Sequence, residues 1–115
     1  MTSTEHPLTG RKLYIPQMSF EASYLVAAAF RSVGVDALPS PDSDEQTLAL
    51  AARYTTGEEC LPQRVILGNL LKVINADRFE AAKTAYLLPT SSGPCRFGQY
   101  APLIQKILRE MGHQD

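Results

Sequence analysis

The chain has 115 residues, a formal net charge of −1, and hydrophobic and charged fractions of 44% and 20%. This length suits one domain with a modest core, and the composition is that of an ordinary soluble globular protein. The near-neutral charge gives no electrostatic basis for binding nucleic acid or an anionic membrane, and no apolar run approaches the roughly 18 residues that span a bilayer, so neither is expected as a partner.

The chain is expected to begin with an arm, a strand and a helix. Residues 1–10 carry no periodic pattern and are expected to form a flexible N-terminal arm. Residues 12–15 predict a short strand, which Pro16 stops. A helix is predicted next, with Gly34 placed as its C-terminal cap. Its apolar positions follow helical spacing: Phe20, Tyr24, Ala27 and Ala28.

A second strand and a capped helix are predicted in the middle of the chain. Residues 35–38 are the weaker strand candidate, because the segment is short and contains an aspartate. Ser43, with Gln46 three residues later, has the form of a capping box. The helix that it opens is expected to run through Tyr54 and to end by Gly57.

The last third of the chain predicts two amphipathic helices around an apolar strand. Pro62 suits the first turn of a helix, whose apolar face is Val65, Ile66, Leu70, Val73 and Ile74. Residues 85–88 form an unbroken apolar run, which is typical of a buried parallel strand. The final helix has an apolar face and ends by Gly112. That face consists of Leu103, Ile104, Ile107, Leu108 and Met111.

The order strand–helix–strand–helix–helix–strand–helix predicts the α/β class. We expect a three-layer βαβ domain with a short, mostly parallel three-stranded sheet in the order 2-1-3 and helices on both faces. Residues 11–115 are expected to form this single domain. Three strands are few for a doubly wound sheet, so we expect the domain to be a piece of a larger protein, with a sheet edge or apolar face left for a partner.

The two cysteines of the chain each lie in a short loop ahead of a helical pattern. Cys60 lies in the sequence GEECLP, and Cys95 lies in GPCRFGQY. A thiol at a helix N-terminus faces free N–H groups, which favour the thiolate, the form that binds soft metals and carries out redox chemistry. Because ligands of such sheets bind where the strands end, we expect both thiols at that edge. A pair of small buried hydrophobic side chains is the structural alternative.

These motifs resemble those of a known family. GEECLP with its leucine-rich helix, followed by PTSSGPCRFGQY, is similar to the cysteine motifs of the 2-hydroxyacyl-CoA dehydratase-like proteins, and more narrowly of the acyl-CoA dehydratase activase-related proteins of anaerobic metabolism. The resemblance extends from Arg11 to Met111. It implies an iron–sulfur cluster, of the [4Fe-4S] type, ligated by Cys60 and Cys95, and a role in ATP-driven, low-potential electron transfer that supports acyl-CoA chemistry.

The resemblance also implies a partner and three neighbouring residues. A cubane cluster normally takes four ligands and this chain supplies two, so the rest of a larger protein or a partner subunit, including a second copy, would complete the set. Gly93 and Gly98 are turn residues that would also let backbone N–H groups approach a cluster. Arg96 would place a fixed positive charge beside an anionic cluster; a solvated surface arginine is an equally open interpretation.

Other classes of function stay open. The runner-up is a non-metal α/β interaction module that oligomerises, and the third is a redox pair of thiols, which no Cys-x-x-Cys motif supports. We assign no catalytic residues, because no nucleophile elbow, Walker A or dinucleotide motif is present. The adjacent Glu58 and Glu59 are more typical of a helix start than of an acid–base pair. The chain alone is therefore not expected to catalyse a reaction, although an enzyme role within a dehydratase or activase system is open.

The N-terminus and the cysteine content indicate the compartment. The first residues lack the basic-then-apolar order of a signal peptide. Two cysteines are not a disulfide framework. We expect a cytoplasmic, reducing location.

Overall fold

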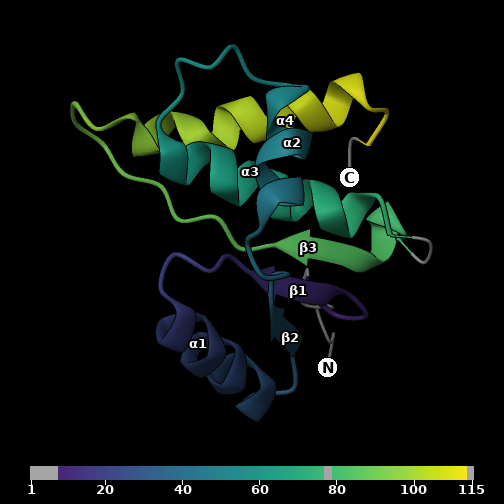
Figure 1. Ribbon diagram of the computed structural model, residues 1–115. Coiled ribbons are helices and arrows are strands. Elements are labelled where there is room, and N and C mark those ends of the chain that lie inside the picture. The colour runs from purple at the N-terminus through teal and green to yellow at the C-terminus, as the bar shows by residue number, and fades with distance from the viewer. Residues whose placement is uncertain (1–7, 77–78, 114–115) are drawn as a thin grey trace.

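A computed structural model describes residues 8–76 and 79–113. It contains three strands, four α-helices and two short 3₁₀ helices within these residues (Figure 1). The strands are β1 (Lys12–Ile15), β2 (Asp36–Pro39) and β3 (Thr84–Tyr86). The helices are α1 (Phe20–Ser32), α2 (Glu45–Ala52), α3 (Leu61–Ile74), η1 (Ala81–Lys83), η2 (Arg96–Gln99) and α4 (Tyr100–Glu110).

The sheet confirms the predicted class and topology. Its order is β2-β1-β3, and β1 pairs in parallel with both neighbours. The observed β2 and β3 differ by one or two residues at each end from the predicted strands 35–38 and 85–88. Pairing with β1 sets these limits, because Lys12 lies opposite both Asp36 and Thr84. The ladder to β3 continues by one bond, since Leu87 N–H donates to the Tyr14 carbonyl at 3.0 Å.

Helices cover both faces of the sheet, and each face has its own core. On one face α1 packs against a small core of Leu13, Ile15, Ala27 and Ala37. On the other face α2, α3 and α4 surround a larger core that includes Leu67, Leu71, Tyr100 and Ile104 (Figure 1). β3 and the two residues after it contribute to both cores: Ala85 and Leu87 pack on the α1 side, whereas Tyr86 and Leu88 pack on the other. The apolar stripe of α3 is therefore core, as its spacing predicts.

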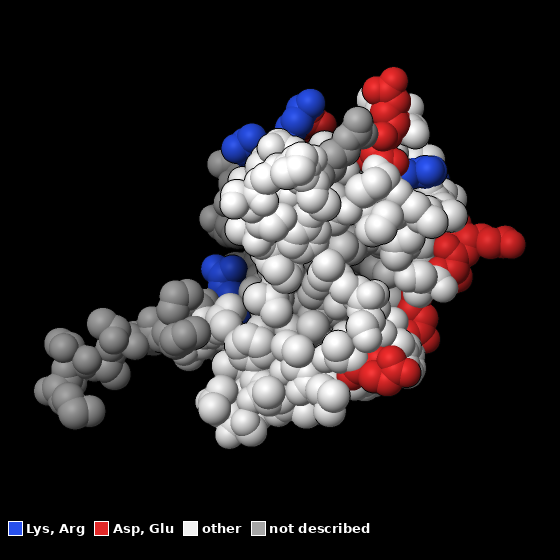
Figure 2. All heavy atoms as spheres, turned by 90° about the vertical axis from the view of Figure 1, so that its left-hand side faces the viewer, with Lys and Arg blue, Asp and Glu red and all other residues white. Residues whose placement is uncertain are grey.

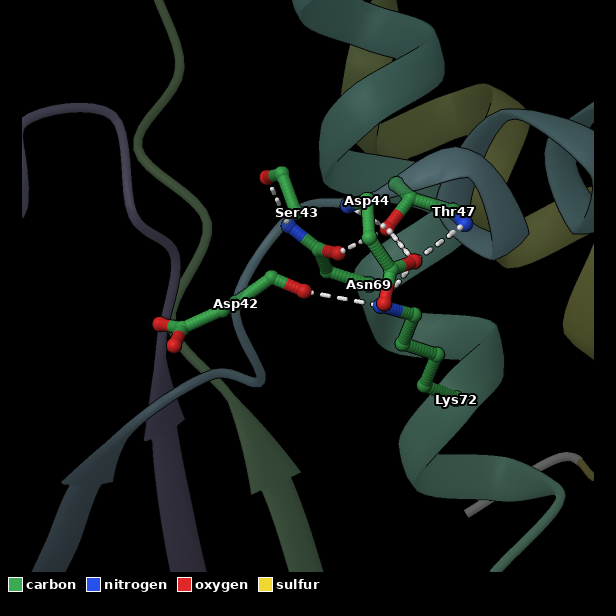
Figure 3. A network of polar contacts seen from close by, with 6 residues as sticks. All are labelled: Asp42, Ser43, Asp44, Thr47, Asn69 and Lys72. Atoms are coloured by element: carbon green, nitrogen blue, oxygen red, sulfur yellow. Dashed lines mark hydrogen bonds and ion pairs between the residues drawn. The ribbon is translucent and has the colours of Figure 1, made fainter.

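The start of α2 differs from the sequence prediction. Asp44, not Ser43, is the N-cap, and it forms a capping box with Thr47 rather than with Gln46. The reason lies in α3, where the side chain of Asn69 is buried. Its amide donates to Ser43 Oγ at 2.9 Å, and its oxygen accepts from Thr47 Oγ1 at 2.8 Å (Figure 3). Ser43 is thus engaged by α3 and leaves the cap to its neighbour.

Lys72 completes this polar network between the two helices. Its ammonium lies 2.7 Å from the Asp44 carboxylate and donates to the Asp42 carbonyl, also at 2.7 Å (Figure 3). The hydrogen bond from Lys72, with those from Thr47, holds the pKa of Asp44 below its usual value. The network fixes the N-terminal end of α2 against the middle of α3.

We expect Asp44 to contribute an acid-dependent part of the stability. Its folded-state pKa is lowered, so its contribution is present above the unfolded-state pKa and is lost as pH falls through the folded-state pKa. Asp44→Asn keeps a good N-cap but removes this titration. Urea unfolding from neutral pH down to about pH 2 should therefore show a smaller acid loss of stability in this variant. Asp36→Asn, on the exposed edge of β2, is the matched control; equal acid profiles for wild type and Asp44→Asn would contradict the assignment.

The predicted arm falls mostly on residues 1–7, which lie outside the described residues. Of the remainder, Leu8 packs against the core under α1, and Arg11 N–H donates to the Leu8 carbonyl at 3.1 Å to close a turn. Within the described ranges, none of the helices combines the length and apolar character needed to cross a bilayer.

Candidate functional site

The strands of the sheet end on the side of the molecule where α3 and α4 begin (Figure 1). Cys60 is the N-cap residue of α3, and Cys95 is the residue before η2, which continues directly into α4. Both cysteines thus precede helices that start at the carboxyl edge of the parallel sheet. The long segment from β3 to η2 protrudes on this same side (Figure 1).

Tyr100 connects the two cysteine loops. Its hydroxyl oxygen lies 2.8 Å from Cys60 Sγ, although the two residues are 40 positions apart in sequence. The tyrosine is the first residue of α4 and only 3% exposed, so its ring is fixed in the larger core. Phe97, from the turn that follows Cys95, meets this ring edge-on with centroids 5.0 Å apart. Cys60 therefore contacts the first residue of α4, five positions after Cys95.

Both sulfurs act electrostatically on this hydroxyl. Burial, then the hydrogen bond to Cys60 and the charges of Cys60 and Cys95, together raise the pKa of Tyr100 to about 12. The phenol therefore keeps its proton at neutral pH.

The two thiols differ in their exposure. Cys60 is half-buried and packs against the larger core, whereas Cys95 is exposed. The residues from Ser91 to Pro94 that precede it are exposed as well. One sulfur is thus anchored in the fold and the other is presented on the surface.

The glycines beside Cys95 shape its loop. Gly93 has a φ of +110°, which side chains rarely tolerate. A Cβ on Gly98 would lie 2.4 Å from the Ser91 carbonyl oxygen, so only glycine lets η2 approach the preceding segment this closely. Both glycines therefore lie beside Cys95 in the chain and define the loop path there. The side chain of Arg96 is outside the described part of the structure.

The acidic pair before Cys60 has a local structural role. The Glu59 carboxylate accepts hydrogen bonds from Thr56 N–H at 3.1 Å and Gly57 N–H at 3.1 Å, and from the Thr56 hydroxyl. The backbone bond from Thr56 is the first cause that lowers the pKa of Glu59. This carboxylate closes the turn that leads to Cys60, which agrees with a structural interpretation rather than an acid–base pair.

The donor atoms fit part of a thiolate-ligated metal site. Among the residues that the structure describes, no three His, Cys, Asp or Glu side chains come together. The described residues therefore offer two thiols of suitable chemistry but not a complete ligand set. One turn into α3 from Cys60, Arg64 has a buried Nε with no hydrogen-bond partner in the described ranges. An unsatisfied cationic donor at this end of α3 is compatible with an anionic group nearby.

The side of the molecule on which the strands end has an uncharged centre among the described residues (Figure 2). Figure 2 shows the side to which the protruding loop points, and its centre carries no lysine, arginine, aspartate or glutamate among the described residues. Acidic side chains gather along one margin instead (Figure 2). Apolar side chains at helix starts on this side are more than half exposed: Met18 and Phe20 at α1, and Leu61 at α3. Such an uncharged, partly apolar face suits contact with another protein surface.

Tyr100 is the residue of this site that sequence reasoning missed. Its spacing from Ile104 and Ile107 on α4 marks it as core, and it is indeed buried with them. The contact with Cys60 depends on how α3 and α4 are packed, which no local pattern encodes. The sequence signal that could have identified Tyr100 as a site residue is its position five residues after Cys95.

Comparison of the chain with family models, with curated proteins and with solved structures returns no match.

Proposed function

We propose that this chain forms one side of an iron–sulfur site, in which Cys60 and Cys95 are ligands and a partner surface supplies the remaining ligands. The observation that supports the proposal is the 2.8 Å contact between Cys60 Sγ and Tyr100 Oη, because Tyr100 is the first residue of α4 and lies five positions after Cys95. The role would be low-potential electron transfer that supports acyl-CoA chemistry, as the resemblance to the 2-hydroxyacyl-CoA dehydratase and activase-related proteins implies.

The two thiol groups are better suited to an iron–sulfur cluster than to a metal ion that prefers oxygen ligands. Iron–sulfur clusters take thiolates as ligands, whereas cations such as Mg²⁺ prefer oxygen ligands. When bound, such a cluster supplies one-electron chemistry. Cys60 would hold it from the fold, and Cys95 would hold it from the exposed loop.

The surface supports completion by a partner. Cys95 is exposed, and the side of the molecule on which the strands end has no charged side chain at its centre among the described residues (Figure 2). Two copies, or a copy and another subunit, can therefore approach without like-charge repulsion. A second copy is the simplest partner, because it would bring two more thiolates of the same kind. Such chemistry needs reduced thiols, so we also propose a reducing, cytoplasmic location.

Anaerobic reconstitution with iron and sulfide tests the proposal. We expect the wild-type chain to acquire a brown chromophore and, after reduction, an electron paramagnetic resonance signal, with iron and sulfide bound in equal amounts. Sedimentation should show that loading shifts the chain from monomer to a larger species. The double variant Cys60→Ser/Cys95→Ser is the control for adventitious iron. Iron content no higher in wild type than in this control, alone or mixed with candidate partner subunits, would contradict the proposal.

A metal-free interaction module is the second candidate. The observation that favours it is the outward face of α1, where Leu25 is 71% exposed and Val33, which follows the helix, is 76% exposed. If this face is an interface, the metal-free chain should self-associate, and Leu25→Lys should reduce the association while Lys106→Glu on α4 should not. A metal-free chain that stays monomeric at high concentration would count against this function.

A further inference from the structure

We propose that the cavity between β3, α3 and α4 binds a small carboxylic acid with an apolar body, whose carboxylate is held by Arg11. Arg11 directly precedes β1, and Thr84, which also lines the cavity, begins β3. The arginine therefore lies where the strands start, at the opposite end of the sheet from the cysteine loops (Figure 1). This binding site does not depend on the proposed iron–sulfur site.

The walls of the cavity are apolar and belong to the core. Its volume is about 360 Å³, which lies in the range of small-molecule sites. β3 contributes Tyr86, α3 contributes Leu70 and Ile74, and α4 contributes Ile104 and Leu108. All five side chains also belong to the larger core or pack against it. The cavity is therefore shaped by the fold before any ligand enters, which suits the hydrocarbon part of a ligand.

The polar side chains of the lining are basic or neutral. They are Arg11, Thr84, Gln105 and His113, and no aspartate or glutamate lines the cavity among the residues that the structure describes. A guanidinium nitrogen of Arg11 donates to the Thr84 carbonyl at 3.3 Å, which holds the arginine across the start of β3. Arg11 forms no ion pair within residues 8–76 and 79–113, so its other N–H groups can donate to a ligand.

The class of ligand follows from this combination of walls and charge. A guanidinium group matches a carboxylate in shape and charge and can bind it through two hydrogen bonds. His113, whose ring meets Phe79 edge-on with centroids 5.2 Å apart, adds a ring N–H to the same lining. A single arginine among apolar walls favours a monoanion with a hydrocarbon body over a polyphosphate, which would need several cations. A second copy of the chain on the edge strand β3 is the other occupant to be tested.

Titration of the metal-free chain with octanoate, octylamine and 1-octanol tests the site. The three probes share a hydrocarbon chain and differ in the charge of the head group. We expect octanoate to bind with millimolar affinity or better and to bind more tightly than the other two, measured by calorimetry and by chemical-shift changes of the lining residues. Sedimentation with and without octanoate shows whether a second copy of the chain occupies the face instead.

A matched pair of arginine variants isolates the role of the charge. Arg11→Gln should weaken octanoate binding about tenfold and leave 1-octanol binding unchanged, because only the charged hydrogen bonds are lost. Arg31→Gln is the control, since Arg31 also donates to a strand carbonyl, that of Ala37 at 2.8 Å, but does not line the cavity. Ala101→Leu on α4 fills the cavity and should weaken both probes. Thermal unfolding checks that each variant folds.

Three results would overturn the inference. They are no saturable binding of octanoate to the wild type, octylamine binding as tightly as octanoate, and octanoate binding that is equal in wild type and Arg11→Gln. A wild-type dimer that octanoate neither enters nor dissociates would assign the face to a second copy and overturn it as well. If Arg11→Gln does not fold, the comparison of the three probes on the wild type and on Ala101→Leu decides. None of these measurements uses iron, so they can fail or succeed apart from the proposed function.

Discussion

Serine at position 60 or at position 95 is expected to abolish assembly of the iron–sulfur centre. Each change replaces a thiolate by a hydroxyl, which is a poor ligand for iron at neutral pH, and a chain with only two candidate ligands has none to spare. Iron and sulfide content after anaerobic reconstitution, with the absorption spectrum, measures the loss. We expect both single variants to fall to the level of the double variant.

The two serine variants should differ in stability although they share the loss of iron. Cys95 is exposed, so Cys95→Ser should leave the unfolding free energy within about 0.5 kcal/mol of wild type. Cys60 is half-buried against the core, and the serine hydroxyl can still bond to Tyr100, so a cost of about 1 kcal/mol is expected. Ser92→Ala, in the exposed segment before Cys95, is the control. Iron content unchanged in both single variants would refute the ligand assignment, and an unfolded Cys60→Ser chain would favour a purely structural cysteine.

Gly68→Ala is expected to destabilise the fold by about 3 kcal/mol, because the added methyl has no room. An ideal Cβ at Gly68 would lie 2.0 Å from the carbonyl oxygen and 2.7 Å from the carbonyl carbon of Thr47. These are backbone atoms at the capped start of α2, so they cannot swing aside as a long side chain would. Urea unfolding of the metal-free chain measures the effect.

The sign of the effect separates crowding from helix propensity. Replacing glycine by alanine inside a helix ordinarily stabilises the folded state by about 1 kcal/mol. A loss of stability in Gly68→Ala would therefore come from the contact between the added methyl and Thr47. Ala49→Gly, on the exposed side of α2, calibrates propensity alone and should cost about 1 kcal/mol. A Gly68→Ala chain as stable as wild type would show that α2 can move away from α3, and the close crossing would not be a constraint.

The sheet and its order follow from the sequence because their causes are local or topological. Apolar runs define the strands, helical spacing defines the connections, and right-handed crossovers leave the order β2-β1-β3, which the structure has. The cap of α2 could not be predicted in the same way. Ser43 with Gln46 satisfies the local rule, but a buried amide on α3 binds Ser43 and leaves Asp44 with Thr47 to form the cap.

In the candidate site, too, local features could be predicted from the sequence, whereas contacts that depend on helix packing could not. That Cys60 and Cys95 lie before helices is visible in the glycine- and proline-rich segments around them. That a tyrosine hydroxyl lies against one thiol is not, because the contact spans 40 residues and depends on the packing of α3 beside α4. The spacing that makes Tyr100 look like core is correct for its ring and carries no information on its hydroxyl. Amphipathic residues of this kind have two roles, and periodicity reports only the apolar one.

The close contact between α2 and α3 has a consequence for the binding of a metal centre. Gly68 against Thr47, with the buried amide of Asn69, pins together the two helices that flank the segment carrying Cys60. The conformational entropy of that segment is therefore lost when the chain folds and not when a ligand arrives. Cys95 follows an exposed segment whose close packing is local, between Gly98 and Ser91. Binding of a metal centre would thus cost less conformational entropy at Cys60 than at Cys95. Cys60 would be positioned before binding, and the Cys95 segment would become ordered when its sulfur binds the same centre.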